Sequence, residues 1–523
     1  MASPIQLIAP NGTKYTQPTG LFINNEFVPS ESGNTLETLN PYDEAPIAKV
    51  ASGNEKDVDN AVAAARAAFK SKLWRGLTPS ERGALLWKLG DLCERDSHIL
   101  ATIDAWDNGK PYQQALDEDI AETISVFRYY AGWADKIYGQ TIDVGSAKLA
   151  YTRHEPLGVC GQIIPWNFPI MMAAWKLGPA LACGNTIVLK PAEQTPLSAL
   201  YLASLIKEAG FPPGVVNIVN GLGNPVGVAL SGHSGVDKVA FTGSTVTGKN
   251  IMKAAASNMK NVTLETGGKS PLLIFDDADL DQAVKWSHMG IMGGMGQVCT
   301  ATSRIYVQDT IYDKYLSLLK DYTLNNTTIG SQFDESVNHG AQISKAQQDK
   351  ILGYVQSGKD EGARLVTGGN AKEGKGYFVE PTIFADTTQD MKIVREEVFG
   401  PFAVIQSFKS EEDAIEKAND SDYGLGAAVF TKDIVKGHSV AHSIEAGMVW
   451  INSSQDSHPG IPFGGCKESG IGMELGAYAL QAYTQVKAVH GQFLALLYKT
   501  RIISLTFPSQ PWYMAIVPCC PKS

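Results

Sequence analysis

The sequence predicts an α/β protein whose strands form mostly parallel sheets. From about residue 156, short apolar strands alternate with helical stretches, which is the pattern of βαβ units. After Gly268 the alternation starts again and continues to about residue 450, which predicts a second α/β unit. A chain of 523 residues is also too long for one core. We therefore expect two or three domains, with a boundary near residues 266–270.

The N-terminal part is predicted to be helical after a loose arm. Residues 1–20 are polar and interrupted by proline and glycine. From about residue 55, apolar residues recur at helical spacing. Thr78-Pro79-Ser80-Glu81 is a capping box with proline at the first helical position, and it begins a second helix. The apolar positions of the two helices are Val58, Ala61, Val62, Ala65 and Phe69, then Leu85, Leu86, Leu89 and Leu92.

Short apolar strands bounded by glycine and polar residues follow in the first α/β unit. One helix between them ends at Cys183-Gly184, and another covers 195–209. The second unit begins with a strand over 272–275. The strands of the first unit are expected at 158–164, 185–189, 215–219, 238–241 and 262–264.

Charge and cysteine usage argue against several classes of protein. The formal net charge is −10 and no long basic run occurs, so nucleic acid and anionic membranes are not expected partners. The seven cysteines are scattered and form no Cys-x-x-Cys pair, which favours reduced thiols. The N-terminus lacks a charged segment followed by an apolar one, and no arginine precedes Arg66. We therefore expect a cytoplasmic protein without a secretory or mitochondrial address.

Three side chains supply a nucleophile, a base and an oxyanion donor for covalent carbonyl chemistry. Cys299 lies in a glycine-rich segment, Glu265 ends an apolar strand about 34 positions earlier, and Asn167 lies in Pro-Trp-Asn-Phe-Pro. Each has a simpler explanation: a buried structural thiol, a surface charge and a turn former. The glycines before Cys299 favour the nucleophile, and the strand end of Glu265 is where open α/β sheets bind ligands.

A possible phosphate site follows the strand at 238–241. The segment Thr-Gly-Ser-Thr-Val-Thr-Gly (242–248) enters a helix, whose N-terminus favours an anion. It matches neither Gly-x-Gly-x-x-Gly nor a P-loop, so a plain strand-to-helix turn explains it equally well. Lys190 and Glu193 follow another strand end, where they could bind ribose hydroxyls or form a solvated ion pair.

Metal and serine-hydrolase chemistry find no support. His438 and His442 have helical spacing but lack the glutamate of a zinc protease. Asp277, Asp279 and Asp281 resemble the start of a calcium loop whose later positions do not fit. No Gly-x-Ser-x-Gly occurs. We expect no metal site.

Seven motifs occur in order along the chain: Pro-Trp-Asn-Phe-Pro (165–169), Lys-Pro-Ala-Glu-Gln-Thr-Pro (190–196), Phe-Thr-Gly-Ser-Thr (241–245), Leu-Glu-Thr-Gly-Gly-Lys (264–269), Gly-Gln-Val-Cys (296–299), Glu-Glu-Val-Phe-Gly-Pro (396–401) and Pro-Phe-Gly-Gly-Cys-Lys-Glu-Ser-Gly (462–470). Together they closely resemble the NAD(P)-dependent aldehyde dehydrogenase family over about residues 20–490, especially its broad-specificity, homo-oligomeric branch and fungal members.

The resemblance implies a fold with a Rossmann-like parallel-sheet cofactor domain, a second α/β catalytic domain and a small β oligomerisation element. The NAD-binding domain would comprise 21–137 and 156–266, after an arm over 1–20. The oligomerisation strands would lie in 138–155 and 483–490, and the catalytic domain would cover 267–482. Residues 491–523 form an atypical tail, whose apolar stretches are too interrupted to span a bilayer. The expected assembly is a homodimer or homotetramer.

The resemblance also implies the chemistry, which is oxidation of an aldehyde to a carboxylic acid. Cys299 matches the nucleophile that attacks the aldehyde carbon, and Asn167 with the Cys299 N–H would hold the oxyanion. Hydride transfer to the nicotinamide then leaves a thioester, and Glu265 matches the base that activates water to hydrolyse it. Glu474 matches a second carboxylate that assists proton movement.

Further matches implied by the resemblance concern the cofactor and the aldehyde. Glu193 would bind a free 2′-hydroxyl and repel a 2′-phosphate, so NAD is preferred over NADP, which is not excluded. The cofactor residues would be Ile163, Ile164, Pro165, Trp166, Lys190, Glu193, Gly223, Phe241, Gly243, Ser244, Gln347, Glu397 and Phe399. The substrate pocket would be formed by Phe168, Met172, Trp175, Val298, Thr300, Ser457 and Phe463.

Three departures from the family pattern concern the pocket. Thr266 replaces a usual leucine, Gly293-Gly294 replace a bulky residue and asparagine, and Gln455-Asp456-Ser457 replace bulkier residues. They predict tolerance of larger or more polar aldehydes than acetaldehyde. Two alternatives remain open: a semialdehyde or amino-aldehyde dehydrogenase of a secondary-metabolite pathway, and an inactive structural relative.

Overall fold

The computed structural model describes residues 3–492, and the chain divides into two compact units. The first comprises Met1–Ile137 and Glu155–Gln485, and the second comprises Tyr138–His154 and Val486–Ser523. The tail predicted at 491–523 lies outside the described residues except for its first two.

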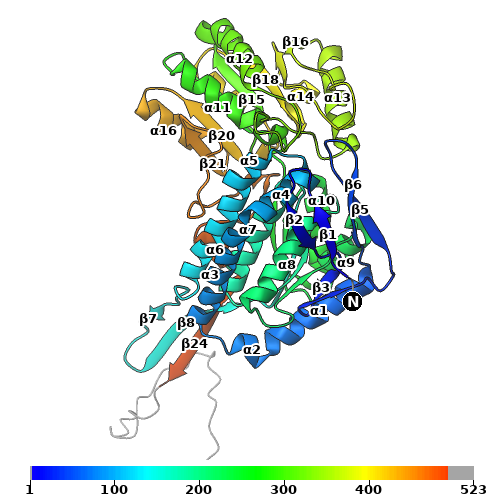
Figure 1. Cartoon of the computed structure of the whole chain (residues 1–523). Coiled ribbons are helices and arrows are strands. Elements are labelled where there is room, and N and C mark those ends of the chain that lie inside the picture. Colours follow the sequence, from blue (N-terminus) through cyan, green and yellow to red (C-terminus); the bar gives the residue numbers. More distant parts are fainter. Residues whose placement is uncertain (1–2, 493–523) are drawn as a thin grey trace, which may run out of the picture. The chain divides into compact units, whose positions relative to one another are not determined.

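An eight-stranded sheet forms the centre of the first half of the large unit (Figure 1). Its five parallel strands β13, β12, β9, β10 and β11 are mostly buried, as expected for strands covered by helices on both faces. The predicted strands are confirmed, with ends shifted by at most one residue. In spatial order the sheet contains β23 (Gly470–Ile471), β13 (Asn261–Glu265), β12 (Lys238–Thr242), β9 (Val159–Ile163), β10 (Thr186–Lys190), β11 (Val216–Ile218), β3 (Leu21–Ile23) and β4 (Glu26–Val28).

The predicted helices of this half are also present, and α3, α6 and α7 pack against one another (Figure 1). Thr78 and Glu81 form the predicted capping box at the start of α3. The apolar stripe of α1 is buried except for Phe69, which is half-buried. The helices are α1 (Glu55–Lys70), α2 (Lys72–Arg75), α3 (Pro79–Arg95), α4 (Ser97–Asn108), α5 (Tyr112–Gln114), α6 (Ala121–Trp133), α7 (Pro169–Ala182), α8 (Leu197–Ala209), α9 (Val228–Gly232) and α10 (Thr245–Ala255). A π-helical segment over Ala115–Ile120 leads directly into α6.

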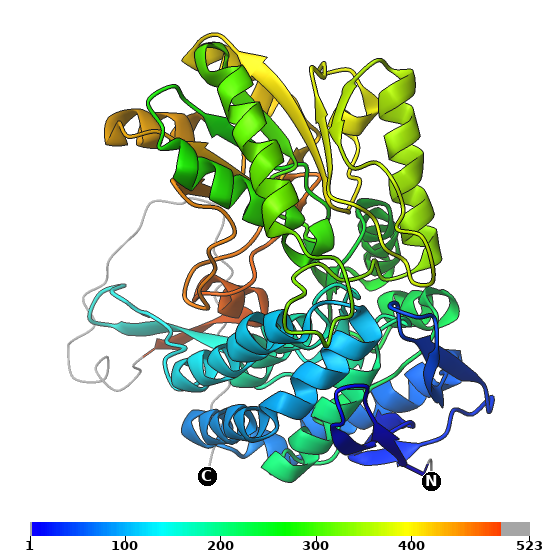
Figure 2. The same ribbon diagram turned by 45° about the horizontal axis from the view of Figure 1, so that its top comes forward.

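A seven-stranded sheet forms the second half of the large unit (Figure 2). All its pairings are parallel except that of the edge strand β16. The spatial order is β16 (Arg364–Thr367), β17 (Thr382–Ala385), β18 (Phe402–Phe408), β15 (Arg304–Gln308), β14 (Pro271–Ile274), β20 (Gly426–Phe430) and β21 (Met448–Ile451). Its helices are α11 (Leu280–Met292), α12 (Tyr312–Asn326), α13 (Lys345–Asp360), α14 (Lys392–Arg395), α15 (Glu411–Asn419) and α16 (Ile434–Ser443). The strand predicted at 272–275 is β14.

The prediction of a loose arm over residues 1–20 is wrong. Strands β1 (Ile5–Ile8) and β2 (Lys14–Gln17) form an antiparallel hairpin. The physical reason is that alternate residues of β2 are buried: Tyr15 packs edge-on against Tyr201, and Gln17 donates a hydrogen bond to the Leu197 carbonyl oxygen (3.2 Å). A second hairpin, β5 (Thr35–Leu39) with β6 (Pro46–Ala51), was not predicted.

The small unit contains a three-stranded sheet in the order β24-β8-β7. The strands are β7 (Thr141–Ile142), β8 (Lys148–Pro156) and β24 (Thr484–Gln492), and their side chains are mostly exposed. Within residues 3–492, none of the helices combines the length and the apolar character that crossing a bilayer requires.

Candidate active site

A cavity of about 710 Å³ in the large unit brings together residues from both sheets. Cys299, Glu265, Asn167 and Glu474, the four residues predicted to be catalytic, all line it. They come from separate elements, so the fold rather than the local sequence assembles them.

Cys299 is placed by a tight turn that follows α11. Gly296 has φ +67°, and a Cβ at this position would lie 2.0 Å from the Gly400 carbonyl oxygen, so only glycine fits. The Cys299 side chain is half-buried and faces the cavity. Burial raises the pKa of its thiol to about 12, and the carboxylates of Glu397 and Glu265 add to the shift.

Glu265 is the last residue of β13 and is almost fully buried. Neither of its carboxylate oxygens has a hydrogen-bond partner among the described residues. Burial raises the pKa of Glu265 well above its usual value, the Glu474 carboxylate raises it further, and Lys176 opposes the shift. A carboxylate whose pKa is raised binds a proton more tightly, and in a cavity it is therefore suited to act as a base.

Glu474 has a charged partner, unlike Glu265. One of its oxygens forms an ion pair with the fully buried Nζ of Lys176, which also donates a hydrogen bond to Thr242 Oγ1 (2.7 Å). The other oxygen has no partner among residues 3–492. Glu265 and Glu474 therefore differ in environment, because only Glu474 is paired with a cation.

Asn167 lies in the loop between β9 and α7 and is buried. Its Nδ2 donates a hydrogen bond to the Gln297 carbonyl oxygen (2.8 Å), two residues before Cys299. Asn108 fixes the loop by donating to the Trp166 carbonyl oxygen (2.7 Å). An amide nitrogen carries two N–H groups, so one remains for an oxygen bound beside the thiol.

Glu397 and its neighbours form another wall of the cavity. Its Oε1 accepts a hydrogen bond from the Gly268 N–H (2.9 Å), and a Cβ at Gly267 would lie 2.5 Å from its other oxygen. The Phe399 ring meets Trp166 edge-on, with centroids 5.3 Å apart. Burial raises the pKa of Glu397.

The strand ends of the first sheet carry the remaining residues predicted to bind a cofactor. Lys190 Nζ lies 3.3 Å from Glu193 Oε2, and burial lowers the pKa of this lysine. Ser244 caps α10, and a Cβ at Gly243 would lie 2.5 Å from the Phe241 ring. Of the residues predicted to bind the cofactor, seven line the 710 Å³ cavity: Pro165, Trp166, Gly243, Ser244, Gln347, Glu397 and Phe399. The other six lie outside its lining: Ile163, Ile164, Lys190, Glu193, Gly223 and Phe241.

All seven residues predicted for the substrate pocket line the cavity: Phe168, Met172, Trp175, Val298, Thr300, Ser457 and Phe463. Glu122 also lines the cavity and was not predicted; its Oε1 accepts a hydrogen bond from Trp175 Nε1 (3.0 Å) and its Oε2 accepts one from Ser457 Oγ (2.8 Å). These partners are 53 and 335 positions away, so no local spacing signals the contact. Other unpredicted lining residues are Asp117, Glu118, Met289, Lys350, Trp450 and His458.

The departures at Thr266 and Gly293 have distinct structural consequences. Thr266 Oγ1 donates to the Glu468 carbonyl oxygen (2.6 Å) and so fixes the 463–475 segment. A Cβ at Gly293 would have only Met289 Sδ within 4 Å, at 3.7 Å, so glycine leaves open space in the cavity wall. The cavity is accordingly wider than a bulky residue at this position would allow.

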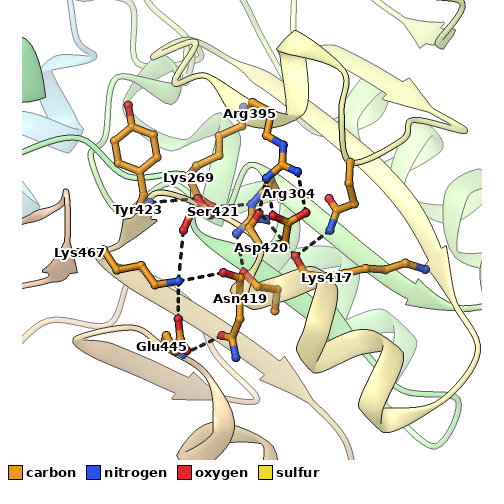
Figure 3. Close-up of polar contacts among 12 residues, drawn as sticks. Lys269, Arg304, Arg395, Lys417, Asn419, Asp420, Ser421, Tyr423, Glu445 and Lys467 are labelled. Carbon is orange, nitrogen blue, oxygen red and sulfur yellow. Dashed lines mark hydrogen bonds and ion pairs between the residues drawn. The ribbon is translucent and has the colours of Figure 1, made fainter.

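The segment after Glu265 is held by a network around Arg304 (Figure 3). Its guanidinium donates to the carbonyl oxygens of Lys269 (2.7 Å) and Ala418 (2.8 Å). Lys269 itself is buried, its Nζ has no partner within the described chain, and burial lowers its pKa to about 7. No group of three His, Cys, Asp or Glu side chains in residues 3–492 is placed to hold a metal ion.

Comparisons with known proteins agree with this geometry. The family model "Aldehyde dehydrogenase family" matches residues 27–489. An aldehyde dehydrogenase of Aspergillus niger is 56% identical over 485 residues, which cover 92% of this chain and 97% of the relative. Human retinal dehydrogenase 2 is 51% identical, covering 94% of this chain and 95% of the relative.

A solved structure supports the same relationship. The NAD+ complex of an aldehyde dehydrogenase from Bacillus cereus has a TM-score of 0.90 and 52% identity, covering 91% of this chain and 97% of that one. The expected family and α/β fold class are confirmed. The chain belongs to the aldehyde dehydrogenase family.

Proposed function

We propose that the protein oxidises an aldehyde to the carboxylic acid with NAD+, through a thioester on Cys299. The observation that carries the proposal is the meeting of a thiol, a side-chain amide and an unpartnered buried carboxylate in one cavity. Membership of the aldehyde dehydrogenase family supports the reaction class. The likeness to an NAD+ complex supports the cofactor.

The residues present fit a dinucleotide. Glu193 beside Lys190 offers a carboxylate and an ammonium group to ribose hydroxyls. The N-terminus of α10 carries no side chain at Gly243, which suits a phosphate, and Glu397 lies in the cavity near Cys299. When bound, NAD+ accepts the hydride from the thiol adduct. A 2′-phosphate would be repelled by Glu193, so we favour NAD over NADP.

Acylation depends on the thiolate and on the oxyanion donors. The thiol must lose its proton, and Glu265 is suited to receive it because burial raises the pKa of this carboxyl. When the thiolate attacks the aldehyde carbon, the oxygen gains negative charge. The free N–H of Asn167 and the backbone N–H of Cys299 would stabilise it, and losing one such donor typically costs about 100- to 1000-fold in rate.

Hydrolysis of the thioester needs a base that attracts a proton from water. Glu265 fits this role because no lysine or arginine of the described residues pairs with it, and the nearby charge of Glu474 increases its proton affinity. The unpartnered oxygen of Glu474 can receive that proton in turn, while Lys176 holds its other oxygen. An inactive structural relative would not need to retain these groups in one cavity.

The test is NADH production from a panel of aldehydes. Wild type should release NADH steadily, and Cys299→Ala should release none. Glu265→Gln should form the acyl adduct on Cys299 more slowly and then retain it, because its hydrolysis lacks a base; mass spectrometry of the trapped enzyme detects the adduct. Full turnover by Cys299→Ala would overturn the proposal.

We also propose the division of labour within the chain. The NAD-binding domain (21–137 and 156–266) would bind the dinucleotide, and the catalytic domain (267–482) would supply the nucleophile. The exposed strands β7, β8 and β24 suit contact with another copy, in a homodimer or homotetramer. Light scattering of the purified protein tests the assembly. A cytoplasmic location remains our expectation, which fractionation of the producing cells tests.

A further inference from the structure

Glu122 is a half-buried carboxylate in the cavity wall that has only neutral hydrogen-bond donors. The Trp175 indole N–H and the Ser457 hydroxyl each donate to one of its oxygens, at 3.0 and 2.8 Å. No lysine or arginine within the described residues forms an ion pair with it. A carboxylate that is partly removed from water is stabilised by a charged partner, and residues 3–492 supply no lysine or arginine as that partner.

The surrounding wall is acidic. Asp117 and Glu118 of the π-helical segment and Asp456 line the same cavity as Glu122. Lys350 is the one lysine or arginine that lines it in the described chain, and its charge interacts with Glu397 and Glu396. His458 is the remaining titratable neighbour of Glu122. The substrate side of the cavity therefore carries an excess of negative charge.

Aromatic rings complete the same wall. Trp175 and Phe463 meet edge-to-face with centroids 4.8 Å apart, and Phe168 and Trp450 also line the cavity. Ring faces attract ammonium groups, most of all where water is excluded. The open space at Gly293 leaves room for a group with several methyl substituents.

We propose that Glu122 is a specificity-determining residue and that the preferred substrate is an aldehyde with an ammonium or quaternary ammonium group on a short chain. The inference rests on the proposed function and names its substrate class. The carboxylate would face the cation, the aromatic rings would cover its methyl or methylene groups, and the aldehyde would reach Cys299. A neutral aldehyde of the same shape would gain the ring contacts but leave Glu122 without a partner.

The test compares aldehydes that differ only in charge. Trimethylammonio aldehydes with one, two or three methylenes are paired with their tert-butyl isosteres, and NADH formation gives kcat/KM for each. We expect wild type to prefer the cationic member of at least one pair by about 10-fold or more. In Glu122→Gln this preference should fall by about 10- to 100-fold, as expected for losing a hydrogen-bonded charge. The kcat/KM for the neutral isosteres should differ between Glu122→Gln and wild type by less than about threefold.

Glu94→Gln is the matched control, because it removes the same charge from an exposed residue of α3 outside the cavity. Its preference should equal that of wild type. An equal preference in wild type and Glu122→Gln would overturn the inference, while NADH formation from the neutral aldehydes would leave the proposed function standing. Absence of NADH and of an acyl adduct with every aldehyde would overturn both.

A measurement on wild type covers the case in which Glu122→Gln does not fold. Choline and 3,3-dimethylbutan-1-ol have the same shape and differ in charge. Each is tested as a competitive inhibitor of neutral aldehyde oxidation. About 10-fold tighter inhibition by choline supports the inference, and equal inhibition overturns it.

Discussion

Alkylation of Cys299 in the cofactor-free protein should be slow and should keep rising with pH. Burial and two carboxylates raise the pKa of its thiol from 9.0 to about 12. At pH 8 about one thiol in 10,000 is then ionised, against about one in eleven for an unshifted thiol, a loss of about 1000-fold. A thiolate of higher pKa is more nucleophilic, so a Brønsted slope of about 0.5 over three pKa units makes the ionised thiol react about 30-fold faster. The net rate should be about 30-fold below that of an unshifted thiol.

The assay is iodoacetamide labelling between pH 7 and 10, with the Cys299 peptide quantified by mass spectrometry. The rate should rise about tenfold per pH unit over the whole range, because the thiol stays below its pKa. Glu397→Gln removes a nearby negative charge and should therefore increase labelling at pH 8. A plateau below pH 9, or a rate at pH 8 equal to that of free glutathione, would refute this reasoning.

Three other changes test single features of the cavity. Because the pKa of Glu265 is raised, the folded state holds the proton of this carboxyl more tightly than the unfolded state does. This residue therefore reduces the stability of the fold as the pH rises above about 4.3, the pKa of glutamate in an unfolded chain. Glu265→Gln should hence raise Tm over wild type more at pH 8 than at pH 5, and an equal gain at both would contradict the pKa. Lys176→Met leaves Glu474 buried without its partner and should destabilise the protein by about 3–5 kcal/mol in urea unfolding; an unchanged midpoint would show that the pair is dispensable. Gly293→Phe fills open space, so kcat/KM for branched aldehydes should fall about 10-fold while that for acetaldehyde is kept, and loss of both would indicate a damaged site rather than a narrowed one.

Much of the fold followed from local patterns in the sequence. The apolar strands and the capping box at Thr78 depend on neighbours only a few residues away, and both were predicted closely. The hairpin at the N-terminus was not, because Tyr15 and Gln17 are buried against α8, about 180 residues further along the chain. Its polar composition gave no sign of that contact.

In the candidate site, too, some residues could be predicted from local patterns, while others depend on contacts between distant segments. Glu265 and Lys190 end apolar strands, and the carboxyl ends of parallel strands meet at one edge of a sheet. Their positions were therefore accessible from the sequence. Glu122 was not, because its carboxylate is held by Trp175 and Ser457 from distant segments. The raised pKa of Cys299 likewise depends on burial and on Glu397, which only the assembled structure provides.

The pairing of β13 with β23 restricts how this cavity can change during evolution or engineering. Glu265 is opposite Gly470, Thr266 N–H donates to the Ser469 carbonyl oxygen, and the same segment carries Phe463 and Glu474. An insertion there would shift both carboxylates as well as the wall that touches the aldehyde. Substitutions on helix α6 or at Gly293 can change substrate selectivity with less effect on the catalytic residues, because the backbone at these positions lies outside this strand pairing.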